Sequence, residues 1–132
     1  MWKQKLCLGV NKQFGKSVCE QIELFKNAGF DGFFTDWDSE SDIKLWKELA
    51  DELGMIYQSV HAPFSRAADF WEDGIKAEEA VEEQIACLHA CAQNNIPIMA
   101  AHVFIGFDKH SPNEIGVKNY ERVVSEAKKL GV

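Results

Sequence analysis

The feature that most constrains the fold of this chain is a fourfold alternation of short apolar segments and longer amphipathic ones. The apolar segments are residues 5–10, 32–37, 55–61 and 97–104, and each has the length and composition of a strand. The segments that follow carry apolar residues at a helical period of 3.6, over about residues 17–28, 39–53, 77–93 and 113–130. Strands that alternate with helices predict right-handed crossovers and a parallel sheet. We therefore expect an α/β fold of four parallel strands in the order 1-2-3-4, with the helices on the outer face.

Residues at the predicted helix ends support these boundaries. Ser17 and Glu20 have the spacing of a capping box, in which each side chain accepts a hydrogen bond from the backbone N–H of the other residue at the start of a helix. Gly54 and Gly131 stand where a helix terminates in the left-handed conformation, and residues 94–95, both Asn, take that place after the third helix. Each predicted helix therefore has a local stop signal before the next strand begins.

The sequence divides into no smaller domains, and its last residues repeat an internal pattern. Residues 128–132 match the helix, stop and strand junctions at residues 27–30 and 52–55. By that pattern Val132 would be the first residue of a fifth strand. We expect residues 1–132 to form one (βα)4 domain that is truncated before a fifth strand. The alternative is the frayed end of a complete small domain.

Charge and composition exclude several classes of protein. The net charge is −7, with 14 basic residues scattered among 21 acidic ones, whereas nucleic-acid binders usually show a basic patch, so DNA or RNA is not the favoured partner. Residues 1–5 lead directly into the first strand without the apolar core of a signal peptide, so we expect a cytoplasmic protein. The four cysteines, Cys7, Cys19, Cys87 and Cys91, are expected to be free thiols, a metal-binding pair at Cys87 and Cys91 being the less favoured alternative.

Candidate functional residues lie where the predicted strands end. In parallel α/β folds the carboxyl ends of strands and the loops after them carry function. Asp36 lies near the end of the second predicted strand, His61 ends the third, and His102 lies near the end of the fourth. A single strand-end histidine is usually structural, whereas two at matching ends favour a shared site. His89, within a helix, and His110, in the loop after strand four, carry less weight.

Two of these strand ends carry a family resemblance. Residues 59–64 read Ser-Val-His-Ala-Pro-Phe, and residues 101–104 read Ala-His-Val-Phe. Together with the junctions at residues 28–32 and 127–132, they resemble the xylose-isomerase-like TIM barrel superfamily, which includes sugar phosphate isomerases and epimerases and the endonuclease IV type of DNA repair enzyme. The resemblance extends over the whole chain and implies half of a (β/α)8 barrel.

The resemblance also implies roles for individual residues. His61 and His102 resemble histidines that contact substrate in the isomerases and metal in the nuclease branch. Asp36 lies where the family often has an acid. Aromatic side chains that would form the walls of a sugar pocket are Trp37, Phe64 and Trp71, although they are at least as well explained as hydrophobic anchors of their loops.

The family's divalent metal (Mn, Mg, Co or Zn) is held mainly by strands five to eight, which this sequence lacks. We therefore expect no complete catalytic site, no bound cofactor and little or no catalysis by the chain alone. The predicted function is the N-terminal half of a divalent-metal-dependent sugar (phosphate) isomerase or epimerase of carbohydrate metabolism. The alternatives are an endonuclease IV-like hydrolase, with His61 and His102 as weak metal ligands, and a non-catalytic half-barrel.

The expected partners are a small sugar or sugar phosphate and a second copy of the chain. Strands one and four would both be open edges with unpaired backbone groups. The inner face of the sheet would expose apolar side chains, which we expect to be Leu6 or Leu8, Phe33 or Phe34, and Ile98 or Met99. An exposed apolar surface of that kind favours self-association.

Overall fold

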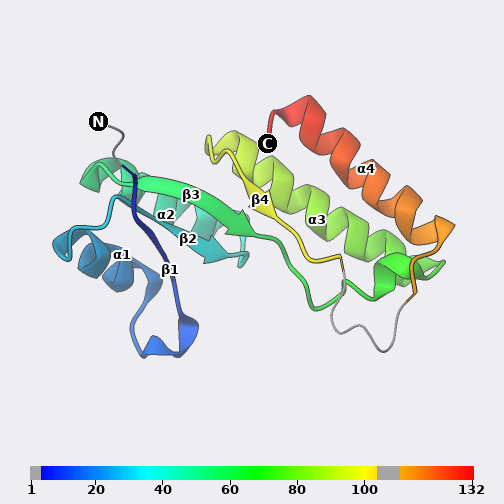
Figure 1. The fold of residues 1–132 in the computed structure, drawn as a ribbon, viewed down its shortest axis with the longest axis horizontal. Coiled ribbons are helices and arrows are strands. Elements are labelled where there is room, and N and C mark those ends of the chain that lie inside the picture. Colours follow the sequence, from blue (N-terminus) through cyan, green and yellow to red (C-terminus); the bar gives the residue numbers. More distant parts are fainter. Residues whose placement is uncertain (1–3, 104–110) are drawn as a thin grey trace.

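The computed structural model describes residues 4–103 and 111–132. The end of the predicted fourth strand, Phe104, and His110 lie outside these residues. The described elements follow the predicted alternation, with two short 3₁₀ helices added in loops (Figure 1). In chain order they are β1 (Cys7–Gly9), η1 (Lys12–Phe14), α1 (Val18–Asn27), β2 (Gly32–Asp36), α2 (Glu40–Leu53), β3 (Ile56–His61), η2 (Asp69–Trp71), α3 (Ile75–Gln93), β4 (Met99–Ala100) and α4 (Glu114–Leu130).

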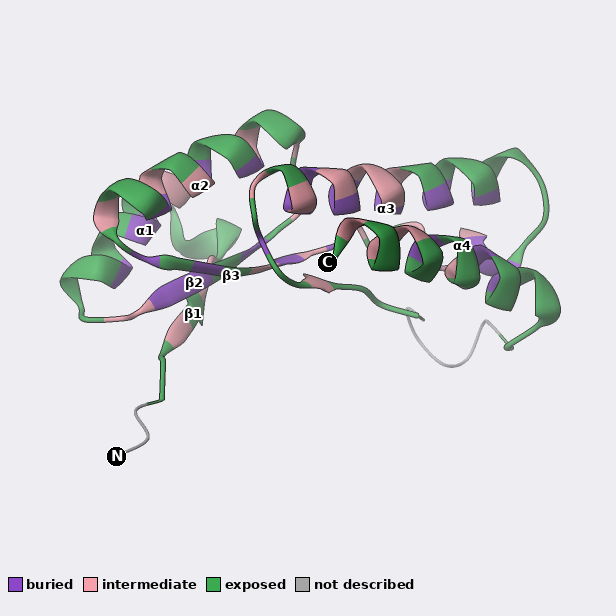
Figure 2. Cartoon of the chain, turned by 90° about the horizontal axis from the view of Figure 1, so that it is seen from above, coloured by how far each residue is buried: buried purple, intermediate pink, exposed green. Residues whose placement is uncertain are grey.

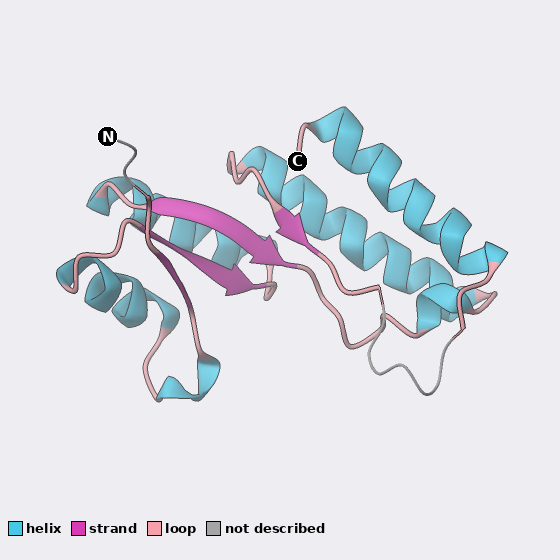
Figure 3. Ribbon diagram, viewed as in Figure 1, coloured by secondary structure: helices cyan, strands magenta, loops and turns pink. Residues whose placement is uncertain are grey.

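The four strands form one sheet in the order β1-β2-β3-β4, and every neighbouring pair is parallel, which confirms the predicted topology (Figure 3). β1 and β4 are shorter than the sequence indicated. Each has only one neighbour to pair with, so the ladder ends where the chain turns away. On the β4 side the last ladder bond runs from the N–H of Ala62 to the carbonyl of Ala100, at 2.8 Å.

The helix ends behave as the sequence predicted. The Ser17 side chain accepts from the N–H of Glu20, and the Glu20 carboxylate accepts from the N–H of Ser17, which completes the capping box. Donation to this carboxylate by the hydroxyl and the N–H of Ser17 holds the pKa of Glu20 below its usual value. Gly54 ends α2 at φ 62°, and Asn95 takes a left-handed φ of 54° after α3. Local chemistry thus sets the length of each helix.

One face of the sheet is covered by α1, α2 and α3 (Figure 2). The side chains that point toward these helices, including Phe33, Tyr57 and Val60, form the main core. α4 packs against α3 and η2, where Phe70, Trp71 and Val123 belong to a second apolar cluster. In the described part of the chain, no helix has both the length and the apolar character to cross a membrane.

Within the described residues, no helix covers the opposite face of the sheet (Figure 2). Successive side chains of a strand alternate between faces, so Phe34 and Ile56 point away from the helices that bury Phe33. The most exposed large apolar side chains here are Phe34 (41%), Ile56 (42%) and Ile98 (49%). The sequence left open whether Phe33 or Phe34, and whether Ile98 or Met99, would lie on this face. The structure places Phe34 and Ile98 there. Leu8 is also exposed, but it pairs with Phe33, so its place is the helix side of the open β1 edge.

Candidate functional site

Asp36 and His61 lie side by side at the carboxyl ends of β2 and β3. They are register partners, and the N–H of Trp37 donates to the carbonyl of His61 at 2.8 Å, which ties the two strand ends together. The distance from Nδ1 of His61 to Oδ1 of Asp36 is 3.9 Å. This separation is too long for a hydrogen bond and leaves the carboxylate half-exposed. Sheet register alone therefore brings an acid and an imidazole to one edge.

His102 joins His61 from the neighbouring strand end, as the sequence predicted. The centroids of the two imidazole rings are 4.8 Å apart. The ring of Phe64 lies 5.2 Å from His61 and 5.5 Å from His102. We call His61, Phe64 and His102 the imidazole cluster. It lies at the carboxyl edge of the sheet, where parallel α/β folds place their function.

One atom of the imidazole cluster lacks a partner. Nδ1 of His61 is buried and has no hydrogen-bond partner within the described residues. A buried polar atom without a bond is costly, and most such atoms in native proteins are satisfied by protein, water or a ligand. The geometry therefore leaves His61 with hydrogen-bonding capacity that the fold does not use.

His61 lines a pocket of about 320 Å³. Four of the six predicted site residues line it, namely Asp36, Trp37, His61 and Phe64. Its remaining lining consists of Lys12, Asp38, Ala62, Pro63, Ser65 and Glu83. His102 contacts the pocket's histidine through its ring without lining the pocket itself.

Sequence reasoning did not single out the charged rim of this pocket. The Nζ atom of Lys12 lies 3.1 Å from Oδ2 of Asp38, so the loops after β1 and β2 are joined across the rim. Both residues lie in segments that follow strands, three residues after the end of β1 and two after the end of β2, which is where parallel α/β folds place function. Glu83 approaches from the middle of α3, where no sequence signal marks it.

Trp71, the sixth predicted site residue, lies elsewhere. It is buried in η2 within the second apolar cluster and does not line the pocket of His61. Its Nε1 donates to the carbonyl of Val103 at 3.0 Å, and its ring lies 5.8 Å from that of Tyr120. These contacts are those of the loop anchor that the sequence left open as the alternative.

The long loop after β3 is fixed from α3. Nε2 of Gln84 donates to the carbonyl of Pro63 at 2.9 Å, directly between His61 and Phe64. Arg66 in the same loop pairs with Asp69 and with Glu79 of α3. Residues 59–64, which resemble the isomerase family, are therefore held by strand pairing and by the hydrogen bond from α3.

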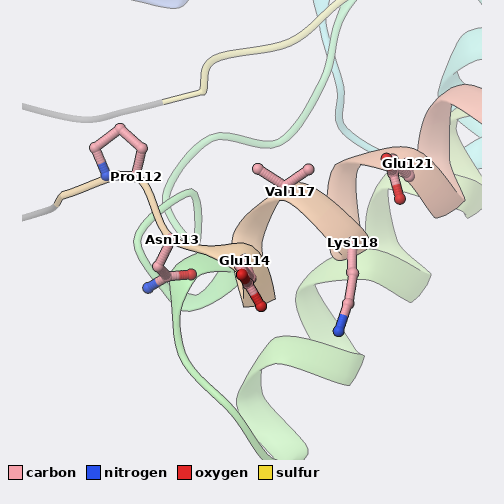
Figure 4. A pocket seen from close by; sticks show the side chains of 6 residues that line it. All are labelled: Pro112, Asn113, Glu114, Val117, Lys118 and Glu121. Atoms are coloured by element: carbon pink, nitrogen blue, oxygen red, sulfur yellow. The ribbon is translucent and has the colours of Figure 1, made fainter.

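A second depression, of about 430 Å³, lies at the start of α4 and has different chemistry (Figure 4). Its six lining residues are all exposed, and they include one lysine and two glutamates but no histidine. The Asn113 side chain there already accepts from the N–H of Gly116 as the helix cap. This depression therefore has no unsatisfied group that points to a ligand.

Metal-ligating side chains do not gather in the described part of the chain. Within residues 4–103 and 111–132, no three His, Cys, Asp or Glu side chains are placed to hold one ion. His61, His102 and Asp36 therefore do not fit a metal site by themselves, because a catalytic zinc site has three protein ligands. All four cysteines are free thiols. Cys87 and Cys91 are buried together, and their mutual hydrogen bond raises the pKa of Cys87.

Comparison with known proteins places this geometry in a fold class. No protein-family model and no curated protein sequence matches the chain. Among solved structures it is similar to D-psicose 3-epimerase with D-tagatose from Clostridium cellulolyticum H10 (17% identity, TM-score 0.76, covering 98% of this chain and 50% of that one). It is also similar to 3-keto-D-glucoside 4-epimerase from E. coli (20%, 0.73, 98% and 54%) and to a xylose isomerase domain protein from Planctomyces limnophilus (10%, 0.69, 96% and 51%).

The chain spans about half the length of each of these structures. Its fold is therefore half of a TIM barrel, as the strand order and the family resemblance predicted. The neighbours that share this fold are xylose isomerase-like barrels, and those named for an activity are sugar epimerases or isomerases.

Proposed function

We propose that this chain is the N-terminal half of a cytoplasmic, divalent-metal-dependent sugar (phosphate) isomerase or epimerase, and that its imidazole cluster forms part of the substrate pocket. The observation that carries the proposal is the approach of His61 and His102, 4.8 Å apart at the carboxyl ends of adjacent strands. This pair lies on a sheet whose structural neighbours include enzymes named as sugar epimerases.

The chemistry of the cluster suits a polyhydroxyl ligand. A neutral imidazole offers one donor and one acceptor, so His61 and His102 can bond hydroxyl groups in either sense. A hydroxyl group of such a ligand would form a hydrogen bond with Nδ1 of His61, which has no partner among the described residues. The half-exposed ring of Phe64 offers an apolar surface against the C–H face of a sugar, and Asp36 accepts from a further hydroxyl. Each role uses a group that the fold leaves available.

These residues do not supply all the groups that catalysis requires. Isomerisation or epimerisation needs a base to remove a proton next to a carbonyl, and an electrophile to polarise that carbonyl. A divalent metal supplies the electrophile when it is bound, but the described residues do not form its site. We propose that the metal ligands and the proton-transfer acids belong to the complementary half of the barrel, and that this half alone turns over little or no substrate.

Two alternative functions are a nuclease and a non-catalytic half-barrel, and the charge and the open face of the sheet distinguish between them. A nucleic-acid substrate is not favoured, because the net charge is −7 and the pocket has three acids, Asp36, Asp38 and Glu83, against Lys12. The exposed apolar face favours a non-catalytic, self-associating half-barrel as the second candidate. The two candidates differ in whether the imidazole cluster binds a sugar.

Nuclear magnetic resonance titration with D-psicose tests the proposal. We expect the imidazole signals of His61 and His102 and the indole signal of Trp37 to shift together, with millimolar affinity, because half of a pocket makes few contacts. His61→Ala should abolish the shifts. His89→Ala is the matched control, because His89 pairs with Glu126 of α4 and does not line the pocket, and it should leave the titration unchanged.

The proposal fails if His61 and His102 do not respond up to high sugar concentration. It also fails if His61→Ala and His89→Ala retain the same response. Either result would leave the non-catalytic half-barrel as the better description.

A further inference from the structure

The backbone that carries His102 is held by two side chains from outside the sheet. The hydroxyl of Tyr120, on α4, donates to the carbonyl of His102 at 2.9 Å. Nε1 of Trp71, in η2, donates to the carbonyl of the next residue, Val103, at 3.0 Å. Two consecutive carbonyls are therefore bonded by aromatic donors from two different elements.

Strand pairing does not reach this segment. β4 ends at Ala100, and the last ladder bond is the one that Ala62 donates to Ala100. His102 lies two residues further on, at an open edge of the sheet with a neighbour on one side only. A strand end without a ladder is free to move unless other groups bond its backbone. The aromatic donors supply those bonds.

The two donors are themselves fixed by α4. The ring of Tyr120 stacks on Phe70 with centroids 4.4 Å apart. Gly116 allows α4 to approach, since a Cβ placed there would lie 2.0 Å from Cε3 of Trp71. The amide groups of Asn113 and Asn119 donate to the carbonyls of Trp71 and Phe70, at 2.8 and 2.9 Å. The start of α4 thus forms one bonded unit with η2 and the segment after β4.

We infer that Tyr120 and Trp71 are positioning residues, which hold His102 against His61 by bonding the backbone carbonyls of His102 and Val103. α4 therefore has a role besides packing against α3. Through the bond of Tyr120 to the backbone of His102, it sets the separation of the two imidazole rings. The ligand that this arrangement serves follows from the proposed function, whereas the positioning itself depends only on the geometry of this chain.

The test compares the two tyrosines of the chain. Tyr120→Phe removes the hydroxyl that bonds His102 and keeps the ring on Phe70. Tyr57→Phe is the matched control, because Tyr57 also stacks on a phenylalanine, Phe33, and bonds elsewhere, to Thr35. The readout is the nuclear Overhauser effect between the ring protons of His61 and His102. We expect Tyr120→Phe to weaken it at least twofold and Tyr57→Phe to leave it unchanged.

Three results would overturn the inference. The first is an undiminished effect in Tyr120→Phe that shows a native amide spectrum. The second is an equal loss in Tyr57→Phe, which would indicate general destabilisation. The third needs no variant. It is the absence of the effect between His61 and His102 in the wild-type chain, and it would overturn the inference even if Tyr120→Phe does not fold.

Titration of both variants with D-psicose separates this inference from the proposed function. If the sugar binds, Tyr120→Phe should weaken its affinity at least threefold while Tyr57→Phe binds as the wild type does. If the sugar does not bind at all but the ring-to-ring effect falls in Tyr120→Phe, positioning stands and the proposed function fails.

Discussion

The two faces of the sheet differ although the same strands build both. On the helix-covered face Phe33 is fully buried and Tyr57 is 4% exposed. On the open face their neighbours along the chain, Phe34 and Ile56, are each about 40% exposed. Phe33 and Phe34 are the same residue type, so composition does not explain the contrast. What differs is whether a helix returns over that face.

The comparison shows that the open face is built like an interior surface. An antiparallel sheet with one solvated face places polar residues there, whereas strands buried on both faces are apolar throughout. In this chain the open face bears Phe34, Ile56 and Ile98, and it bears the imidazole cluster at its carboxyl edge. The candidate site therefore lies on the border of a surface suited to being covered.

Truncation of one phenylalanine on each face should show the contrast most strongly. We expect Phe33→Ala to lower the free energy of unfolding by about 3–5 kcal/mol, because it opens a cavity in the main core. Phe34→Ala should cost only about 1 kcal/mol, since its ring covers Gly9 but remains partly in water. Urea unfolding of both variants at low protein concentration measures the difference. Equal costs would mean that the open face is covered in the isolated chain.

Self-association of the purified chain tests whether the open face of the sheet is suited to being covered. We propose that a second copy covers the open face. β1 and β4 are both open edges, and a two-fold axis along the strand direction would pair β4 of each copy with β1 of the other. The similarity to half of a closed barrel indicates that the sheet has the curvature for this closure. Light scattering after size-exclusion chromatography should detect a dimer at micromolar concentration.

Substitutions on the open face sharpen this prediction. Phe34→Ser and Ile98→Ser should each weaken dimerisation about tenfold, which corresponds to roughly 1.4 kcal/mol. Leu45→Ser is the control, because Leu45 is equally exposed but lies on α2, which covers the opposite face of the sheet. A wild-type monomer that binds no hydrophobic dye would contradict the proposal, as would an equal effect of all three substitutions.

The smallest expected effect is a dependence of stability on alkaline pH. Burial raises the pKa of Tyr57 on the covered face, and it raises the pKa of Tyr120 to about 12. An unfolded tyrosine ionises near pH 10, so the unfolded state gains stability above that pH before the folded state does. The contribution of the two tyrosines to folding stability should therefore be constant below about pH 10 and fall as the pH rises further.

Urea midpoints between about pH 8 and pH 11 measure this loss. Tyr57→Phe should remove more of the slope than Tyr120→Phe, because Tyr57 is the more deeply buried of the two. An unchanged slope in Tyr57→Phe would contradict the assignment to the covered face.

Local signals in the sequence were sufficient for most of the fold. The capping box at Ser17, the left-handed Asn95 and the stop at Gly131 all act within a few residues, so they could be recognised before any tertiary contact was known. The strand order followed from the alternation of strands and helices, because crossovers in parallel sheets have one preferred hand. The same topology predicted that His61 and His102 end at one edge.

Register and long-range packing decided the rest. Periodicity could not show which of Phe33 and Phe34 is buried, since a shift of one residue exchanges the faces of a strand. No local pattern marked Glu83 as part of the pocket, or Trp71 and Tyr120 as bonded to the segment of His102. The bonds of Trp71 and Tyr120 join residues from 17 to 32 positions apart. The sequence by itself determined which elements form and in what order, because those choices are local, and only the tertiary structure decided which side chains meet.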